Sequence, residues 1–251
     1  MKEHNILQGP PRPQDQPEPD AWLRRVATLP LMRQPGEKWM YDLGLDVLGV
    51  LIARASGKPL ETFLRERIFE PLGMKDTGFS VPPAKLDRLA TCYHTHPATG
   101  AMEVWDASAT APIAARPRSP PPPEGWSRPS TTTCFGQMML QNGKHGTERI
   151  LSRPSIEAMT ENQLTPEQKA GSELILGDNR GWGLGLSMIT QRDGIAANPG
   201  RFGWDGGFGT SWGSDPREDM VAILMTQRLW DSPSGPGVYL DFWTSVYQAI
   251  D

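Results

Sequence analysis

Apolar residues fall at helical spacing in the first part of the chain. Val47, Leu48, Leu51, Ile52 and Ala55 follow the i, i+3, i+4 pattern, which predicts an amphipathic helix over residues 43–55. Ser56-Gly57 would end this helix, because glycine readily adopts the left-handed conformation found at helix C-termini. A second helix is expected directly afterwards, with Pro59 in its first turn. Its apolar stripe is Leu60, Phe63, Leu64 and Ile68.

The same kind of pattern predicts further helices over residues 21–29, 135–142, 154–163 and 239–250, the first with Asp20 as its N-cap. Loops and short strands are expected over residues 75–105. Alternating apolar and small residues predict a strand over 182–189. Residues 208–212 and 220–226 are also strand-like, with a turn between them at Ser214-Asp215-Pro216. The run 220–225 is nearly all apolar, as in a strand covered on both faces. The predicted class is therefore α+β, an antiparallel sheet packed with helices.

Proline marks two segments that do not fit a packed domain. Residues 1–20 contain five prolines and are expected to be a flexible lead-in. Residues 107–133 alternate proline with alanine, serine, threonine and arginine, without any apolar period, and are expected to be irregular. The remaining chain, 21–251, is expected to form one domain that contains this irregular segment.

Composition excludes several classes of partner. The net charge of −4 gives no electrostatic reason to expect nucleic acid, and no apolar run reaches the ~20 residues of a membrane span. The first residues lack the apolar core of a signal peptide, which predicts a cytoplasmic protein. Cys92 and Cys134 are expected to be thiols without a disulfide. Because His94 and His96 have no acid or cysteine cluster nearby, neither a metal nor another cofactor is expected.

Tyr41 is the first residue with candidate chemistry. It follows the turn Pro35-Gly36 and stands just before the predicted helix. A phenol held over a cleft, with its pKa lowered by a cation, can act as general base toward a serine hydroxyl. A tyrosine in this position can equally serve packing alone.

A glycine-rich strand near the end of the chain is the second candidate. The segment 203–212 reads Gly-Trp-Asp-Gly-Gly-Phe-Gly-Thr-Ser-Trp. Glycines weaken a strand unless something approaches the backbone closely, such as a ligand whose oxyanion accepts from an N–H. The alternative is a glycine-rich hairpin or bulge.

These two segments resemble the class C β-lactamase, penicillin-binding-protein and esterase family of serine hydrolases. The stretch 35–79, from Pro-Gly-Glu-Lys-Trp-Met-Tyr to Pro-Leu-Gly-Met-Lys-Asp-Thr-Gly-Phe, is similar to the region around that family's active-site tyrosine. The segment Gly-Trp-Asp-Gly-Gly-Phe-Gly-Thr resembles its third motif. The similarity covers most of residues 20–106 and 135–251, and it implies a β-lactamase/transpeptidase-like fold and an acyl-enzyme mechanism on small-molecule esters or amides.

The resemblance also implies roles for individual residues. Tyr41 would be the catalytic base, Trp204, Asp205 and Gly206 would bind substrate at the third motif, and the Gly207 N–H would donate to the oxyanion. Trp204 stands where the family often has a cation, which argues against a β-lactam carboxylate and favours an esterase-like substrate. Asp42-Leu43 departs from the commoner Tyr-x-Asn pattern, so the amide of that pattern is missing.

The family's nucleophile lies in a Ser-x-x-Lys motif, and this sequence contains no such motif. The sequence is therefore interpreted as an N-terminally incomplete, truncated copy that is inactive by itself. The alternative is a non-catalytic ligand-binding module, or pseudoenzyme, built around Tyr41 and Trp204.

The proline-rich segment has two explanations. The family shows Ser-Thr-x-x-Asp-Tyr at a helix start in this region. One possible codon series for Gly125 to Cys134, regrouped by one base, encodes Met-Val-Ser-Thr-Val-Asp-Asp-Tyr-Leu, which matches that pattern. One hypothesis is thus a local frame shift that ends near Phe135, and the other is a natural linker that binds a polyproline-recognising domain. Sequencing the coding DNA distinguishes them.

Overall fold

The computed structural model describes residues 18–41, 43–107, 129–232 and 235–250. Residues 1–17 of the predicted lead-in and 108–128 of the proline-rich segment lie outside these residues, as does most of the stretch that the frame-shift hypothesis concerns. The predictions are wrong for residues 19–20 and 129–133, which begin two helices. The helices are α1 (Pro19–Val26), α2 (Leu43–Ser56), α3 (Leu60–Leu64), α4 (Pro129–Leu140), α5 (Arg153–Thr160), α6 (Pro166–Lys169), α7 (Glu173–Leu176) and α8 (Gly237–Gln248). A π-helical turn, Arg65–Phe69, continues α3, and a 3₁₀ turn spans Pro83–Arg88.

The strands are β1 (Cys92–Thr95), β2 (Met102–Asp106), β3 (Lys144–His145), β4 (Glu148–Arg149), β5 (Arg180–Trp182), β6 (Ser187–Ile189), β7 (Phe202–Gly206), β8 (Thr210–Asp215) and β9 (Met220–Met225). The last five form an antiparallel sheet in chain order, and β1–β2 and β3–β4 are separate two-stranded ribbons.

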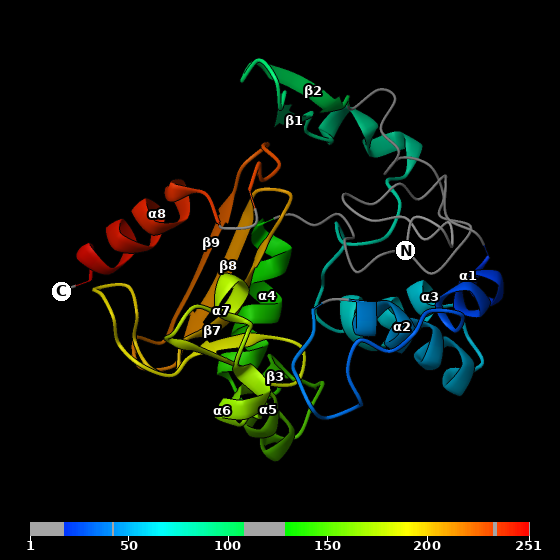
Figure 1. Cartoon of the computed structure of the whole chain (residues 1–251), viewed down its shortest axis with the longest axis horizontal. Coiled ribbons are helices and arrows are strands. Elements are labelled where there is room, and N and C mark those ends of the chain that lie inside the picture. The colour runs from blue at the N-terminus through cyan, green and yellow to red at the C-terminus, as the bar shows by residue number, and fades with distance from the viewer. Residues whose placement is uncertain (1–17, 42, 108–128, 233–234, 251) are drawn as a thin grey trace.

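Helices α4 and α8 cover opposite faces of the main sheet (Figure 1). Trp212 and Gly213 are successive residues of β8, so they face opposite sides. A Cβ on Gly136 of α4 would meet the Trp212 indole at 2.8 Å, whereas a Cβ on Gly213 would meet Trp243 of α8 at 2.6 Å. Both helices also contact β9, as expected for a strand covered on both faces, but its residues are only partly buried.

The main core lies between α4 and the sheet. Its buried residues are Leu72, Met74, Met138, Met139, Ile156, Leu186, Met188 and Phe202. Leu72 and Met74 come from the loop after α3 and its π-helical turn, so this loop ties the segment that follows Tyr41 to the sheet.

The predicted helix pair after Tyr41 is confirmed. Gly57 ends α2 with a φ of +66°, and Pro59 precedes α3 as its N-cap. Gly49 brings the pair together, because a Cβ there would come within 2.9 Å of Leu60. The outer face of α2 stays apolar, with Leu48 45% and Leu51 59% exposed.

Two helix starts differ from the prediction. Helix α1 begins at Pro19 after Glu18, so Asp20 lies inside the first turn, where its carboxylate pairs with Arg54 at 2.6 Å instead of capping. Helix α4 begins at Pro129, six residues before the predicted start. Its predicted end is confirmed, because Asn142 and Gly143 both have positive φ.

The predicted strand 182–189 is in fact a hairpin of β5 and β6. Gly183 and Gly185 make the turn, since Gly185 has a φ of +93° and a Cβ on Gly183 would lie 1.9 Å from the Met159 carbonyl oxygen. The predicted turn at Ser214-Asp215-Pro216 is right only for Pro216: β8 runs through Asp215, which is fully buried, and the turn spans residues 216–219, with Asp219 at positive φ. Likewise Phe208 lies in the β7–β8 turn and not in a strand.

Candidate active site

Tyr41 and Trp204, from the two candidate motifs, are in contact. The Trp204 indole Nε1 donates a hydrogen bond to the Tyr41 phenolic oxygen across 3.1 Å. Tyr41 lies just before α2 and is 41% exposed, and Trp204 is in the middle of β7. The approach to α2 is anchored because the Trp39 backbone N–H donates to the Gln168 carbonyl at 2.9 Å.

Four aromatic side chains form a cluster around this hydrogen bond, and we call it the aromatic cluster: Trp39, Tyr41, Trp182 and Trp204. The ring centroids of Trp182 and Trp204 are 4.8 Å apart in an edge-to-face arrangement, and those of Tyr41 and Trp204 are 5.3 Å apart. Sequence reasoning missed Trp182, because it was placed in one long strand. No local pattern links it to Tyr41, since the contact depends on the β5–β6 hairpin.

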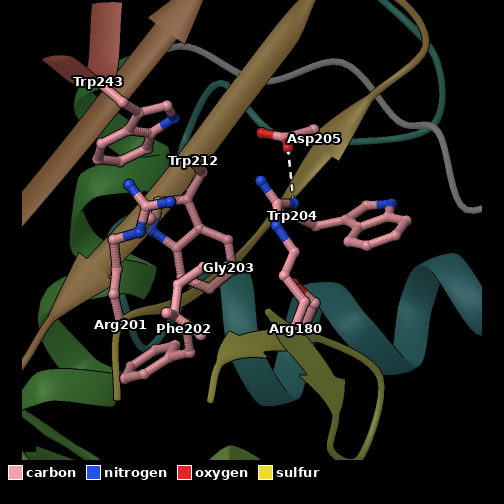
Figure 2. A pocket seen from close by; sticks show the side chains of 11 residues that line it. Arg180, Arg201, Phe202, Gly203, Trp204, Asp205, Trp212 and Trp243 are labelled. Carbon is pink, nitrogen blue, oxygen red and sulfur yellow. Dashed lines mark hydrogen bonds and ion pairs between the residues drawn. The ribbon is translucent and has the colours of Figure 1, made fainter. Parts of the chain in front are cut away.

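The Asp205 side chain does not lie beside Tyr41. It follows Trp204 on β7 and therefore points to the opposite face. Its carboxylate accepts from Arg180 Nη1 at 3.0 Å and from Ser211 Oγ at 2.5 Å. Ser211 Oγ in turn accepts from Trp243 Nε1 of α8 at 2.9 Å. This network fixes α8 on the sheet, and Figure 2 shows the Arg180–Asp205 ion pair beside the strand.

Gly206 and Gly207 stand where β7 turns into β8. The Gly206 carbonyl accepts from the Tyr239 hydroxyl at 3.1 Å, and the Gly207 carbonyl accepts from the Trp230 N–H at 2.9 Å. Gly207 is exposed, and a Cβ there would meet nothing within 4 Å. The turn at Gly209 has a φ of +87°, so the glycine-rich segment is a hairpin whose end is open to a ligand.

Lys38 is the lysine nearest to Tyr41 in sequence, but its ammonium group is used elsewhere. Its Nζ donates to the carbonyls of Glu167 at 2.6 Å and Ala170 at 3.2 Å. It therefore anchors the α6 region and does not take the place of the cation that a catalytic phenol needs.

Other features of the described residues limit the chemistry. Within the described ranges, no group of three or more His, Cys, Asp or Glu side chains is placed to hold a metal ion. None of the helices in the part of the chain that the structure covers has the length and apolar content to cross a bilayer. Cys92 and Cys134 form no disulfide. Burial, with Asp106 nearby, raises the pKa of the Cys92 thiol, which disfavours the nucleophilic thiolate.

The family model of the beta-lactamases matches residues 5–237. The chain belongs to the beta-lactamase family. The family resemblance is thus confirmed over a range that includes both candidate motifs.

Two curated proteins are similar in sequence to this chain over most of its length. Protein Rv1367c of Mycobacterium tuberculosis is 34% identical over 230 residues, which are 85% of this chain and 54% of that protein. Esterase EstB of Burkholderia gladioli is 31% identical over 86% of this chain and 56% of the esterase. The chain therefore spans about half the length of the curated relatives it matches.

A solved structure shows the same fold. A mutant of simvastatin synthase from Aspergillus terreus superposes with a TM-score of 0.70 at 22% identity, covering 91% of this chain and 60% of the synthase. The predicted α+β, β-lactamase/transpeptidase-like fold is confirmed. The family assignment does not test the roles of Tyr41, Trp204, Asp205, Gly206 and Gly207, which stay predictions.

Proposed function

We propose that this chain carries the substrate-binding part of a serine ester hydrolase, with small-molecule esters or amides as substrates. The supporting observation is the hydrogen bond between Trp204 and Tyr41, which brings both family motifs to one partly exposed place. The similarity to an esterase supports the reaction class. Because the chain spans about half of that relative, the activity of the whole protein is part of the proposal.

In the proposed reaction a serine hydroxyl attacks the ester carbonyl and forms an acyl-enzyme, which water then hydrolyses. Tyr41 takes the hydroxyl proton, and the Gly207 N–H donates to the oxyanion. The serine and lysine of Ser-x-x-Lys do not occur in these 251 residues. Tyr41 and the hairpin can bind the substrate, but the nucleophile has to come from elsewhere.

The absence of that motif favours a second candidate for the chain by itself, a ligand-binding module without turnover. The position of Lys38 agrees with this reading, since its ammonium group is held by the carbonyls of the α6 region. The expected property of the isolated 251-residue chain is therefore binding without hydrolysis.

The side chains of the site favour an apolar or aromatic substrate group. The aromatic cluster offers ring faces and edges, and Trp204 adds one N–H donor without charge. Arg180 of β5 is already paired with the Asp205 carboxylate. The charge of Arg180 is therefore not available to a substrate carboxylate.

The test uses the 251-residue chain with three readouts: hydrolysis of a p-nitrophenyl ester, labelling by a fluorophosphonate, and binding of an unreactive aryl ketone analogue followed by tryptophan fluorescence. We expect saturable binding, without turnover or labelling. The matched variants are Trp204→Phe and Trp230→Phe, because both indoles donate to a tyrosine hydroxyl. Only Trp204→Phe should weaken binding, by about tenfold for a lost polar contact of this size.

Turnover together with covalent labelling would contradict the claim that this chain lacks a nucleophile. A chain that folds but does not bind the ketone would contradict both candidate functions. If Trp204→Phe and Trp230→Phe weakened ketone binding equally, the ligand would not bind specifically at the aromatic cluster.

A further inference from the structure

A small pocket lies beside β7 where α8 packs on the sheet, and Trp204 and Trp243 are both among its lining residues. Four of its side chains are Arg180 of β5, Arg201 just before β7, Asp205 of β7 and Trp243 of α8, with Gly203 and Gly213 between them. Gly203 and Gly213 are cross-strand partners, so the floor of the pocket is bare backbone. Figure 2 shows the two arginine side chains on either side of Gly203.

Arg201 is buried but not satisfied. It is only 8% exposed, and its guanidinium lies 4.1 Å from the centre of the Trp243 ring. Its Nη1 has no hydrogen-bond partner among the described residues. A buried N–H of a charged group without an acceptor is costly, and native structures supply an acceptor from protein, water or an ion.

The acidic groups nearby accept from other donors, and none of them is within hydrogen-bond distance of Arg201 Nη1. Asp205 accepts from Arg180 and Ser211 through its two oxygens. Asp215 accepts from Asn198 Nδ2 and from the Arg217 N–H, both at 2.9 Å, and also from the Tyr247 hydroxyl. The unmet donor therefore faces a pocket whose carboxylates are committed to other donors.

The pocket holds charges of both signs. Asp205 also lines it and pairs with Arg180 at 3.0 Å, which leaves Arg201 as the cation with an unmet donor. Burial lowers the pKa of Arg201 and Arg180 adds to this, whereas Tyr247, Asp205 and Asp215 oppose it. A negative ion in the pocket would accept from Arg201 Nη1 and compensate the charge of this buried guanidinium. Water could offer an acceptor but no compensating charge.

We propose that this pocket binds a small monovalent anion of the halide type, with Arg201 as its principal ligand and Arg180 as the second cation. The cavity volume is about 20 Å³, which is room for one or two water-sized species. A halide fits this space and a sulfate does not. The pocket shares the lining residue Trp204 with the aromatic cluster, but its anion ligands are other residues, and the site does not depend on the proposed hydrolase function.

Trp212 also lines the pocket, but its Nε1, the second unsatisfied buried donor among the described residues, is directed elsewhere. It points to the α4 face, where a Cβ on Gly136 would lie 2.8 Å from it. The anion site therefore rests on the α8 face alone.

The experiment measures the thermal midpoint of the 251-residue chain in chloride, bromide and gluconate at constant ionic strength. The midpoint should rise with the logarithm of halide concentration and not with gluconate, because a ligand that binds only the folded state stabilises it by mass action. Arg201→Met keeps the stem over Trp243 but removes the donor, so its midpoint should not respond to halide. Arg153→Met, which alters an exposed arginine, should respond like the parent chain.

A crystal soaked in bromide supplies the direct readout, and it serves even if Arg201→Met does not fold. We expect an anomalous peak within hydrogen-bond distance of Arg201 Nη1. A water at that place, with equal midpoints in halide and gluconate, would overturn the proposal. A bromide peak without any halide response in solution would also overturn it, as an adventitious ion only.

Discussion

The Trp204 indole N–H and the Tyr41 phenolic oxygen are joined by a 3.1 Å hydrogen bond between residues 163 positions apart. This bond links the start of α2 to the middle of β7, and it leaves Tyr41 partly exposed beside the β7–β8 hairpin. A double-mutant cycle measures what it contributes. In Tyr41→Phe, Trp204→Phe and the double variant, the coupling energy in urea unfolding should be about 0.5–1.5 kcal/mol.

The Trp230–Tyr239 pair is the matched control for that cycle, because its Nε1 also donates to a tyrosine hydroxyl, at 2.9 Å. Its cycle should show coupling in stability, with a smaller effect on ketone binding, because the Tyr239 hydroxyl reaches the site only through the Gly206 carbonyl. Strictly additive effects of Tyr41→Phe and Trp204→Phe would mean that the hydrogen bond is absent in solution.

Asp205→Asn should separate stability from ligand binding. The amide cannot pair ionically with Arg180 and presents one acceptor instead of two, so we expect a loss of about 1–3 kcal/mol in the free energy of unfolding. The aryl ketone should bind with nearly unchanged affinity, because the carboxylate points away from Tyr41. Circular dichroism in urea and the fluorescence titration measure the two quantities.

If Asp205→Asn instead abolished binding in a chain of normal stability, the side chain would belong to the ligand site after all. That result would restore the role that the family resemblance implies for it.

Gly213→Ala should destabilise the contact between α8 and the sheet. The added methyl group would lie 2.6 Å from Trp243 Cη2, and relief requires a shift of the whole indole. Overpacking of this kind costs about 1–3 kcal/mol, measurable as a lower urea midpoint at unchanged slope. Gly237→Ala is the control, since its Cβ meets nothing within 4 Å, and it should leave the midpoint unchanged or slightly higher.

Stability should fall in alkaline solution because of Tyr239. Burial raises the pKa of its phenol to about 12 from an ordinary value of 10.0. Between these values the unfolded chain has released the proton and the folded chain has kept it, so the free energy of unfolding decreases by about 1.4 kcal/mol per pH unit. Below pH 10 this contribution is fully present.

Tyr239→Phe should reduce the slope of that decrease, as measured by urea unfolding from pH 8 to pH 11. Tyr247 adds to it, because burial also raises its pKa, and the double variant Tyr239→Phe/Tyr247→Phe should remove most of it. If the double variant kept the same dependence of unfolding free energy on pH, groups other than Tyr239 and Tyr247 would account for the loss of stability.

Several elements could be predicted from the sequence because their signals are local. The apolar period and the glycine at Gly57 define α2, the run Met220–Met225 defines β9, and the paired stripe of Tyr239 and Trp243 defines α8. The family could also be recognised from the segments around Tyr41 and Trp204, since both motifs are contiguous in the chain. Strand and helix ends were less predictable, as at Asp215, whose burial depends on donors from other elements.

What the sequence determined by itself is therefore the class, the family and the two candidate motifs. The tertiary structure alone decided that Trp182 joins Tyr41 and Trp204, because a glycine turn folds β5 back on β6. It also decided that Trp204 and Asp205, adjacent in the chain, serve opposite faces of β7. The alternation of side chains along a strand determines that Trp204 and Asp205 face opposite sides of β7. The groups that each side chain contacts depend on the tertiary structure, because α8 packs on one face and Tyr41 approaches the other.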